Sequence, residues 1–440
     1  MNIYEHLKNY KSLGRSSFHT PGHKYNFFRN FDFLGIDLTE LPLTDSLYES
    51  SGIIKEAEEK VSRLYESKAS FFSAGGNTLC IQAMIKLACG YGGKILCDRV
   101  VHRSAVSAMA LLGVEPIWVR RNIDKISGIA TNIDIEDLKL KLEKNPEATA
   151  LYITSPSYHG VLQDISSISE ICKKYGVAVL VDNAHGAHLK FLGVHPLDQG
   201  ASLVADSAHK TLPVLTGGAW LHVNDDKFKD EAKSAMALFG STSPMYPIMA
   251  SLDLAREWLS ENGFEEYNCL KLQVNKIKEV AKNKGIYLLS DKATCDPTRI
   301  TLGVFKIGYS GPEFREELYK FKIEPEFCDE NFVVLIPTPF NLPLDWNRLK
   351  TAIESIKPKF PQRSRVCENI PFPDVYQPLY QAIRNPSVKV DIAKALNKVA
   401  AEIVCPCPPG IPVVMPGEKI GLMEQRRLKE YGIKEISVVK

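Results

Sequence analysis

The pattern of apolar and polar positions singles out a long region in which strands and helices alternate. From residue 70 to about residue 225, apolar runs of strand length are separated by stretches with helical spacing. The predicted strands are Lys94–Cys97, Glu115–Val119, Ala148–Ile153, Val177–Val181 and Ser202–Ala205, and the predicted helices are 78–89, 103–112, 134–143 and 165–175. Alternation of this kind predicts an α/β fold with a mostly parallel sheet covered by helices.

The start of the chain is less regular. Residues 1–17 predict a polar amphipathic arm, whereas residues 18–50 are rich in Pro, His, Asp and Thr and show no period. We expect an ordered but irregular segment there, followed by a helix at 53–66.

A second, smaller unit is predicted after the alternating region. Residues 226–285 are charged and helical, and residues 286–357 combine short strands with helices. We expect a Pro-rich linker at 358–375 and a helix near 389–401. The predicted parts are an N-terminal arm and interface segment at 1–50, a large domain at 51–255, a small α/β domain at 256–357, and a linker with a C-terminal subdomain at 358–440.

Composition excludes several classes of function. The net charge of +2 gives no electrostatic reason to expect nucleic acid or an acidic membrane as a partner. The apolar runs are too short to span a bilayer, and the start lacks the apolar core of a signal peptide, so a cytoplasmic location is expected. The ten cysteines form no Cys-x-x-Cys unit, and the close histidine pairs are interrupted by Gly or Pro, so no metal site is expected.

Polar residues follow two of the predicted strands directly. The run VAVLVDNAHGAH places Asp182 after one strand, and LVADSAHKT places Lys210 after the next. Ligands of open α/β sheets bind at the carboxyl ends of the strands. A buried carboxylate needs a partner such as a protonated pyridine, and a desolvated lysine can form a Schiff base. A helix cap or salt bridge for Asp182 and a surface position for Lys210 are the alternatives.

Two further features lie beside helix starts. In FFSAGGNTLC, Gly75 and Gly76 precede a helix whose N-terminus could bind an anion, although such turns also occur without ligands. The sequence has no P-loop pattern there. His102 opens another predicted helix, where its ring could stack on a flat group or could serve only as a cap or a core residue.

Taken together, these motifs resemble those of the Orn/Lys/Arg decarboxylase family of fold-type-I enzymes, which depend on pyridoxal 5′-phosphate (PLP). The resemblance spans nearly the whole chain and preserves the order of the motifs. They are FHTPGHK (18–24), DLTELPLTDSL (37–47), the loop at 71–84, HRS (102–104), DNAHGAH (182–188), SAHKTLPVLT (207–216) and PPGIPVVMPGE (408–418).

The resemblance implies a role for each matching residue. Lys210 would form the Schiff base, Asp182 would pair with the pyridine nitrogen, His102 would stack on the ring and His185 would lie beside it. It also implies a homodimer with active sites at the interface, near segment 18–47 of the partner. The remaining cofactor-binding residues would be Gly76, Asn77, Thr78, Ser207 and His209, which hold the phosphate, and Ala184.

The chain departs from the family pattern at several positions. Asn77 and Thr78 replace a usual Thr-Ser or Thr-Thr pair, and Asn183 occupies a position that is often acidic. The other departures are Arg103 in place of Lys, Gly217 in place of Gln, and Cys407 in place of Tyr. Those at Gly217 and Cys407 bear on the substrate, because both could lie near it.

The resemblance implies decarboxylation of arginine, lysine or ornithine, with Lys210 or His185 returning a proton to Cα. The alternatives are another PLP reaction, such as an aminotransferase with Arg299 holding the α-carboxylate, or a non-catalytic PLP-binding regulatory protein. The distal cation of the substrate needs a carboxylate. The candidates are Asp37, Glu40, Asp45, Glu324, Glu326, Asp329 and Glu330.

Overall fold

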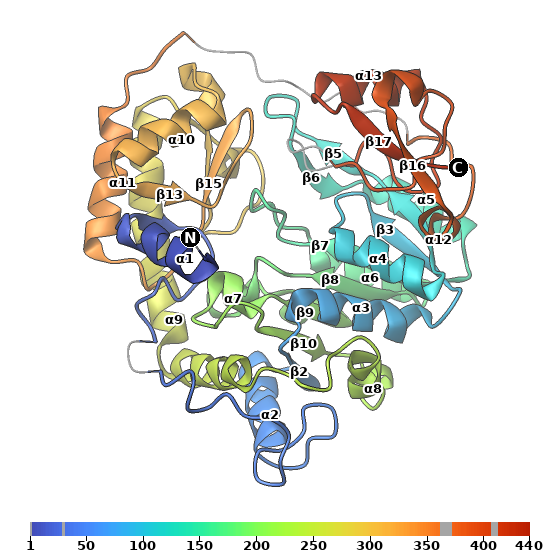
Figure 1. Ribbon diagram of the computed structural model, residues 1–440, viewed down its shortest axis with the longest axis horizontal. Helices are drawn as coiled ribbons and strands as arrows, with labels where there is room; N and C mark the ends of the chain where they lie inside the picture. Colours follow the sequence, from blue (N-terminus) through green and yellow to red (C-terminus); the bar gives the residue numbers. More distant parts are fainter. Residues whose placement is uncertain (1, 29–30, 361–371, 406–411) are drawn as a thin grey trace.

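The computed structural model describes residues 2–28, 31–360, 372–405 and 412–440, and a seven-stranded sheet forms its centre (Figure 1). The strand order is β2-β10-β9-β8-β7-β3-β4; β10 is antiparallel to both neighbours and the other pairs are parallel. This confirms the predicted α/β fold. The strands are β2 (Ala69–Ser73), β3 (Lys94–Asp98), β4 (Glu115–Val119), β7 (Ala148–Thr154), β8 (Ala178–Asp182), β9 (Leu203–Asp206) and β10 (Ala219–Val223).

Helices cover both faces of this sheet because its buried strands are apolar on both sides. In β8, for example, Ala178 and Leu180 face one layer of helices, while Val179 and Val181 face the other. The first layer contains α3 (Gly76–Cys89), α4 (Arg103–Leu112) and α8 (Ala232–Ala237). The second contains α2 (Ile53–Tyr65), α5 (Ile135–Lys144), α6 (Ile165–Lys174) and α9 (Tyr246–Asn283).

The long helix α9 leads to a second, antiparallel sheet with the order β11-β12-β15-β14 (Figure 1). The N-terminal arm joins this part, because β1 (Ser16–Phe18) pairs in parallel with β13 (Ile323–Pro325). The arm itself starts with α1 (Ile3–Ser12). The other elements here are β11 (Tyr287–Leu288), β12 (Ile300–Gly303), α10 (Gly311–Lys320), β14 (Phe327–Cys328), β15 (Phe332–Leu335) and α11 (Pro343–Ser355).

The C-terminal part shows that the predicted helix near 389–401 is wrong. Residues 387–391 form β16 (Ser387–Asp391), which pairs antiparallel with β17 (Glu435–Val439). Only a short 3-10 turn, Ile392–Lys394, follows, and Asn397 takes a left-handed backbone conformation with φ 64°. The apolar positions from 392 to 400 have helical spacing, but pairing with residues distant in sequence prevails at both ends of the segment, in β16 and at the bridges Val399–Lys419 and Ala400–Val438.

Four further elements are the paired strands β5 (Arg121–Ile123) and β6 (Ala130–Ile133) and the helices α12 (Leu379–Arg384) and α13 (Leu422–Glu430). The predicted linker at 358–375 falls largely outside the described residues, and the domain boundaries stay predictions. In the described parts of the chain, no helix is both long and apolar enough to cross a membrane.

Candidate active site

Asp182 and Lys210 lie at the same edge of the central sheet. Asp182 is the last residue of β8, and Lys210 lies in α7 (Ala208–Thr211), four residues beyond the end of β9. Because β8 and β9 are parallel neighbours, their carboxyl ends meet at this edge. The charges of Asp182, Lys210, His102 and His185 influence one another, so the structure brings these four predicted residues together.

The carboxylate of Asp182 is surrounded by neutral donors. Its Oδ1 accepts from Asn77 Nδ2 at 2.9 Å and from the Ala184 N–H at 3.2 Å, and its Oδ2 accepts from the Tyr152 hydroxyl at 2.8 Å. Asp182 is 2% exposed, and no cationic side chain of the described residues forms an ion pair with it. The salt-bridge alternative is therefore not seen within those residues, and a buried negative charge there suits a cationic ligand.

The amine of Lys210 lies 3.2 Å from Nε2 of His185. Burial lowers the pKa of Lys210 below its usual value, while the carboxylates of Asp182 and Glu326 oppose that shift. Burial also lowers the pKa of His185 well below its usual value, and Lys210 adds to this effect. A lowered pKa brings the neutral amine, the form in which a lysine acts as a nucleophile, within easier reach.

A tight turn precedes α3, where the sequence predicts a phosphate cradle. Gly76 has a φ of 69° and donates its N–H to the Gly217 carbonyl at 2.8 Å. The Ser73 hydroxyl accepts from Gly75 N at 3.2 Å and donates to Gly76 O at 2.9 Å. Thr78 is exposed at the first turn of the helix, where N–H groups lack intrahelical partners.

The residues around α7 supply further donors at this edge. Ser207 Oγ lies 3.3 Å from Nδ1 of His209, and that nitrogen donates to the Gly218 carbonyl at 3.1 Å. Burial lowers the pKa of His209. The backbone carbonyl of His209 accepts from the Gly22 N–H at 2.8 Å, so the N-terminal segment closes over α7.

His102 is the N-cap of α4, as one of the alternatives proposed. Its Nδ1 accepts from the Ser104 N–H at 3.3 Å and lies 2.7 Å from the Ser104 hydroxyl. The ring is exposed, so the core alternative is wrong. A ring that caps a helix through one nitrogen and leaves its face open can also stack on a flat ligand.

Two tyrosines at this site were not predicted from the sequence. Tyr152 points at Asp182 from β7. The ring of Tyr158 packs edge-on against His185 at 4.8 Å between centroids, and its hydroxyl donates to Glu326 at 2.7 Å. Strand alternation could have revealed Tyr152, because it shares a face with Leu180 and Asp182. Tyr158 lies in a loop, which alternation does not place.

Most of the acidic candidates for the substrate cation have partners of their own. Glu324 pairs with Arg15, Asp329 lies 2.9 Å from His159, and Asp45 accepts from backbone N–H groups at the start of α2. Glu40 accepts from the Ser46 hydroxyl, and Asp37 and Glu330 are exposed. Glu326 differs from these, because its charge acts on Lys210.

Arg299, the arginine expected to bind a carboxylate in an aminotransferase, is turned towards the protein. Its guanidinium donates to the carbonyls of Tyr158 at 3.4 Å and His185 at 3.3 Å, and lies 3.7 Å from Asp296. These hydrogen bonds hold the backbone of His185, which lies beside Lys210, and of Tyr158, whose hydroxyl donates to Glu326.

The positions that depart from the family pattern are also placed. Asn183 is buried and donates to Asp206 at 2.6 Å, away from Asp182. Gly217 has a φ of 98° and receives the Gly76 N–H. Arg103 is exposed in the first turn of α4, and Cys407 lies outside the described residues.

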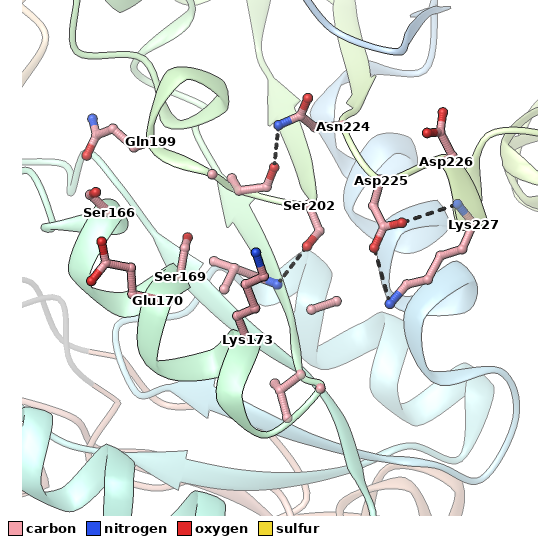
Figure 2. Close-up of a pocket in the computed structure, with 16 residues that line it drawn as sticks. Ser166, Ser169, Glu170, Lys173, Gln199, Ser202, Asn224, Asp225, Asp226 and Lys227 are labelled. Carbon is pink, nitrogen blue, oxygen red and sulfur yellow. Dashed lines mark hydrogen bonds and ion pairs between the residues drawn. The ribbon is translucent and has the colours of Figure 1, made fainter.

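A separate hollow of about 690 Å³ lies at the opposite edge of the sheet (Figure 2). Its walls include Ala178 at the start of β8, Ser202 just before β9, and Lys173 of α6. It is far from the strand ends that carry Asp182 and Lys210. Within the described ranges, no group of three or more His, Cys, Asp or Glu residues is placed to hold a metal ion.

The fold and the site together define a class of protein, the fold-type-I PLP enzymes. The structure superposes on the constitutive lysine decarboxylase of Escherichia coli with a TM-score of 0.77, covering 99% of this chain and 83% of that one at 18% identity. The residues fit PLP: a buried carboxylate without a cationic partner within the described residues, a lysine of lowered pKa and an open helix N-terminus meet at one edge.

Sequence comparison gives the family. Residues 2–291 match the model of the Orn/Lys/Arg decarboxylase major domain, and residues 374–431 match its C-terminal domain. The chain is 34% identical to the protein YaaO and 32% identical to an arginine decarboxylase, both of Bacillus subtilis (strain 168); each alignment covers 95% of this chain and 91% of the relative. The chain belongs to the Orn/Lys/Arg decarboxylase family of PLP-dependent enzymes.

Proposed function

We propose that this chain decarboxylates a basic amino acid, with arginine preferred over lysine and ornithine. The observation that carries the proposal is the meeting of Lys210 and Asp182 at adjacent strand ends, one with a lowered pKa and the other buried among neutral donors. The preference for arginine rests on the similarity to the arginine decarboxylase of Bacillus subtilis over 95% of this chain.

The proposed cofactor site uses the residues at this edge of the sheet. Lys210 would hold PLP covalently, Asp182 would face its pyridine nitrogen, and His102 would cover the ring. Gly76, Thr78, Ser207 and His209 would surround the phosphate, and Ala184 would lie beside the cofactor through the turn that donates to Asp182. When bound, PLP supplies an electron sink for the bond that loses CO₂.

The protein groups control protons around that bond. Lys210 Nζ and His185 Nε2 lie 3.2 Å apart, so a proton held by one can pass to the other and then to Cα of the substrate. His185 is buried and Lys210 is half-buried, which limits the water around both groups and favours the loss of a carboxylate that is poorly solvated.

The distal end of the substrate requires a negative partner. Glu326 is suited to this role, because it is the small-domain carboxylate whose charge acts on Lys210. The Tyr158 hydroxyl and the Thr20 N–H, at 2.7 Å and 2.8 Å, hold the Glu326 carboxylate in place. Segment 18–47 of a second chain would supply the other candidate carboxylates, those of Asp37, Glu40 and Asp45. The active form would therefore be a homodimer. A cytoplasmic location stays a prediction.

Product analysis tests the proposed function. The purified protein with PLP is incubated with arginine, lysine and ornithine separately, and CO₂ and the amine are measured. We expect both products in equal amounts, most rapidly from arginine, and none from the Lys210→Ala variant. Release of a keto acid without CO₂ would indicate an aminotransferase, and the absence of any product would favour a PLP-binding protein without catalysis.

A further inference from the structure

The side chain of Asn77, which the resemblance assigned to the phosphate, points at a carboxylate. Asn77 is the second residue of α3 and is 8% exposed. Its Nδ2 donates to Oδ1 of Asp182 at 2.9 Å, inside the protein. The two residues are distant in sequence, and they meet because α3 packs across β8 with its N-terminus at the edge where β8 ends.

The orientation of the Asn77 amide is fixed by charge. The opposite orientation would place Oδ1 against the Asp182 carboxylate, where two acceptors repel each other. In the observed orientation Oδ1 is buried and has no hydrogen-bond partner among the described residues. An acceptor oxygen cannot bind a phosphate dianion, so this end of the amide offers the phosphate nothing.

The Asp182 carboxylate is thus held from two directions. Asn77 donates to one oxygen from a helix N-terminus, and the fully buried Tyr152 donates to the other at 2.8 Å from the neighbouring strand. The Ala184 N–H also donates to Oδ1, at the longer distance of 3.2 Å, so Asn77 supplies the shorter of the two bonds that hold this oxygen. Donors on both oxygens fix the plane of the carboxylate, and loss of the Asn77 bond would loosen it.

We propose that Asn77 is a positioning residue that orients Asp182 towards the ring nitrogen of the cofactor, and that it is not a phosphate ligand. The family pattern has threonine here, whose hydroxyl reaches less far than an amide. The proposal rests on the proposed PLP site, because it assigns Asn77 to one part of that site.

Three aldehydes distinguish a positioning role of Asn77 from a phosphate-binding or purely structural role. Each aldehyde is titrated into the apoenzyme, and its binding is followed by absorbance. PLP has both phosphate and ring nitrogen, pyridoxal lacks the phosphate, and salicylaldehyde lacks both. Loss of a hydrogen bond to a charged group corresponds to about a ten- to hundredfold weaker affinity. We expect Asn77→Thr to weaken the binding of PLP and of pyridoxal by that factor. Its affinity for salicylaldehyde should stay within about threefold of the wild-type affinity.

The matched controls change the phosphate contacts and the second donor. Ser207→Ala should weaken the binding of PLP alone, because Ser207 is assigned to the phosphate. Tyr152→Phe removes the other side-chain donor to Asp182 and should give the same pattern of affinities as Asn77→Thr. Circular dichroism of each apoprotein checks the fold, and Asn77→Ser replaces Asn77→Thr if that variant does not fold.

Each other result overturns the proposal. Weakening of PLP alone by Asn77→Thr would make Asn77 a phosphate ligand, equal weakening of all three aldehydes would make it a structural residue, and no change would leave it without a role. A wild-type protein that binds neither PLP nor pyridoxal would instead refute the proposed function itself.

Discussion

Lys210 and Asp182 lie at the same site, but they differ in the partners that replace the water lost on burial. For Lys210, burial disfavours the charged form and lowers its pKa. For Asp182, three donors within 3.2 Å replace the lost water, so a charged carboxylate has partners at 2% exposure. A lysine of lowered pKa next to a well-supported carboxylate is a combination that suits covalent binding of a cationic ring.

Replacing Lys210 with Ala should abolish the visible absorbance of the bound cofactor, because no other lysine is assigned to the site. The measurement is a spectrum of the purified variant after incubation with PLP, followed by borohydride reduction and peptide mapping. A reduced cofactor adduct on a lysine in the variant would show that the assignment of Lys210 is wrong.

Replacing Asp182 with Asn should reduce turnover by about 10²- to 10³-fold, because a neutral amide cannot stabilise a protonated ring nitrogen. The amide still offers Tyr152 an acceptor, so the free energy of unfolding should change by less than about 2 kcal/mol. Turnover and urea unfolding are measured on the same preparations. Turnover near wild type would mean that Asp182 only supports the turn at Ala184.

Sequence reasoning located these residues because it needed only strand ends. Asp182 and Lys210 follow apolar runs, and parallel strands bring such positions together. The partners of Asp182 were not located in this way. The contact of Asn77 depends on the angle at which α3 crosses the sheet, which no local pattern encodes.

At the scale of whole elements, prediction succeeded for strands of the central sheet, whose apolar runs are bounded by polar or turn residues. Predicted and observed bounds of β4 agree, and those of β3 and β8 differ by one residue. It failed at 389–401, where Val388 and Val390 alternate with polar residues but the apolar positions that follow suggest a helix. The choice there depends on β17, which lies more than forty residues further along.

The packing of α2 against β2 gives a pH-dependent stability. Glu58 of α2 is 4% exposed, accepts from Phe72 N of β2 at 3.0 Å and lies 2.8 Å from Lys233. Burial raises the pKa of Glu58 from 4.5 to about 7, although Lys233 opposes the shift. The folded protein therefore binds the proton more tightly than the unfolded chain, and this contribution is lost as the pH rises through that range.

The test compares wild type with Glu58→Gln, whose side chain does not titrate. Between pH 4.5 and about 7, the wild type should lose about 3 kcal/mol of unfolding free energy relative to the variant. Urea unfolding at pH 4.5, 6 and 8 measures the difference. A constant difference across these three values would contradict the raised pKa.

At the scale of the molecule, a buried ion pair attaches the C-terminal part to the central sheet. Arg99, next to the end of β3, donates two hydrogen bonds to Glu418, at 2.5 Å and 2.9 Å, with both side chains nearly fully buried. Glu418 also accepts from the Met415 N–H at 2.7 Å. The pair lies three residues before His102, so it ties the C-terminal part to the candidate site.

Glu418→Gln should lower the free energy of unfolding by about 3–5 kcal/mol, because Arg99 would stay buried without its counter-charge. The matched control is Lys282→Met, which removes an exposed pair with Asp291 at 3.3 Å and should cost less than about 1 kcal/mol. Chemical unfolding measures both. Equal effects of the two changes would show that burial does not strengthen the Arg99 pair.

The N-terminal segment carries the last prediction, which concerns assembly. Leu34 and Leu43 are 84% and 96% exposed in a segment that runs along the outside of the molecule before α2 (Figure 1). Leucines exposed to this degree in an ordered segment suit contact with a second chain. We therefore expect the wild type to sediment as a homodimer at assay concentration, and Leu34→Asp combined with Leu43→Asp to sediment as an inactive monomer. Leu272→Asp, at a position of α9 that is 62% exposed, is the control and should leave both mass and activity unchanged. A fully active monomer of the wild type would refute a site built from two chains.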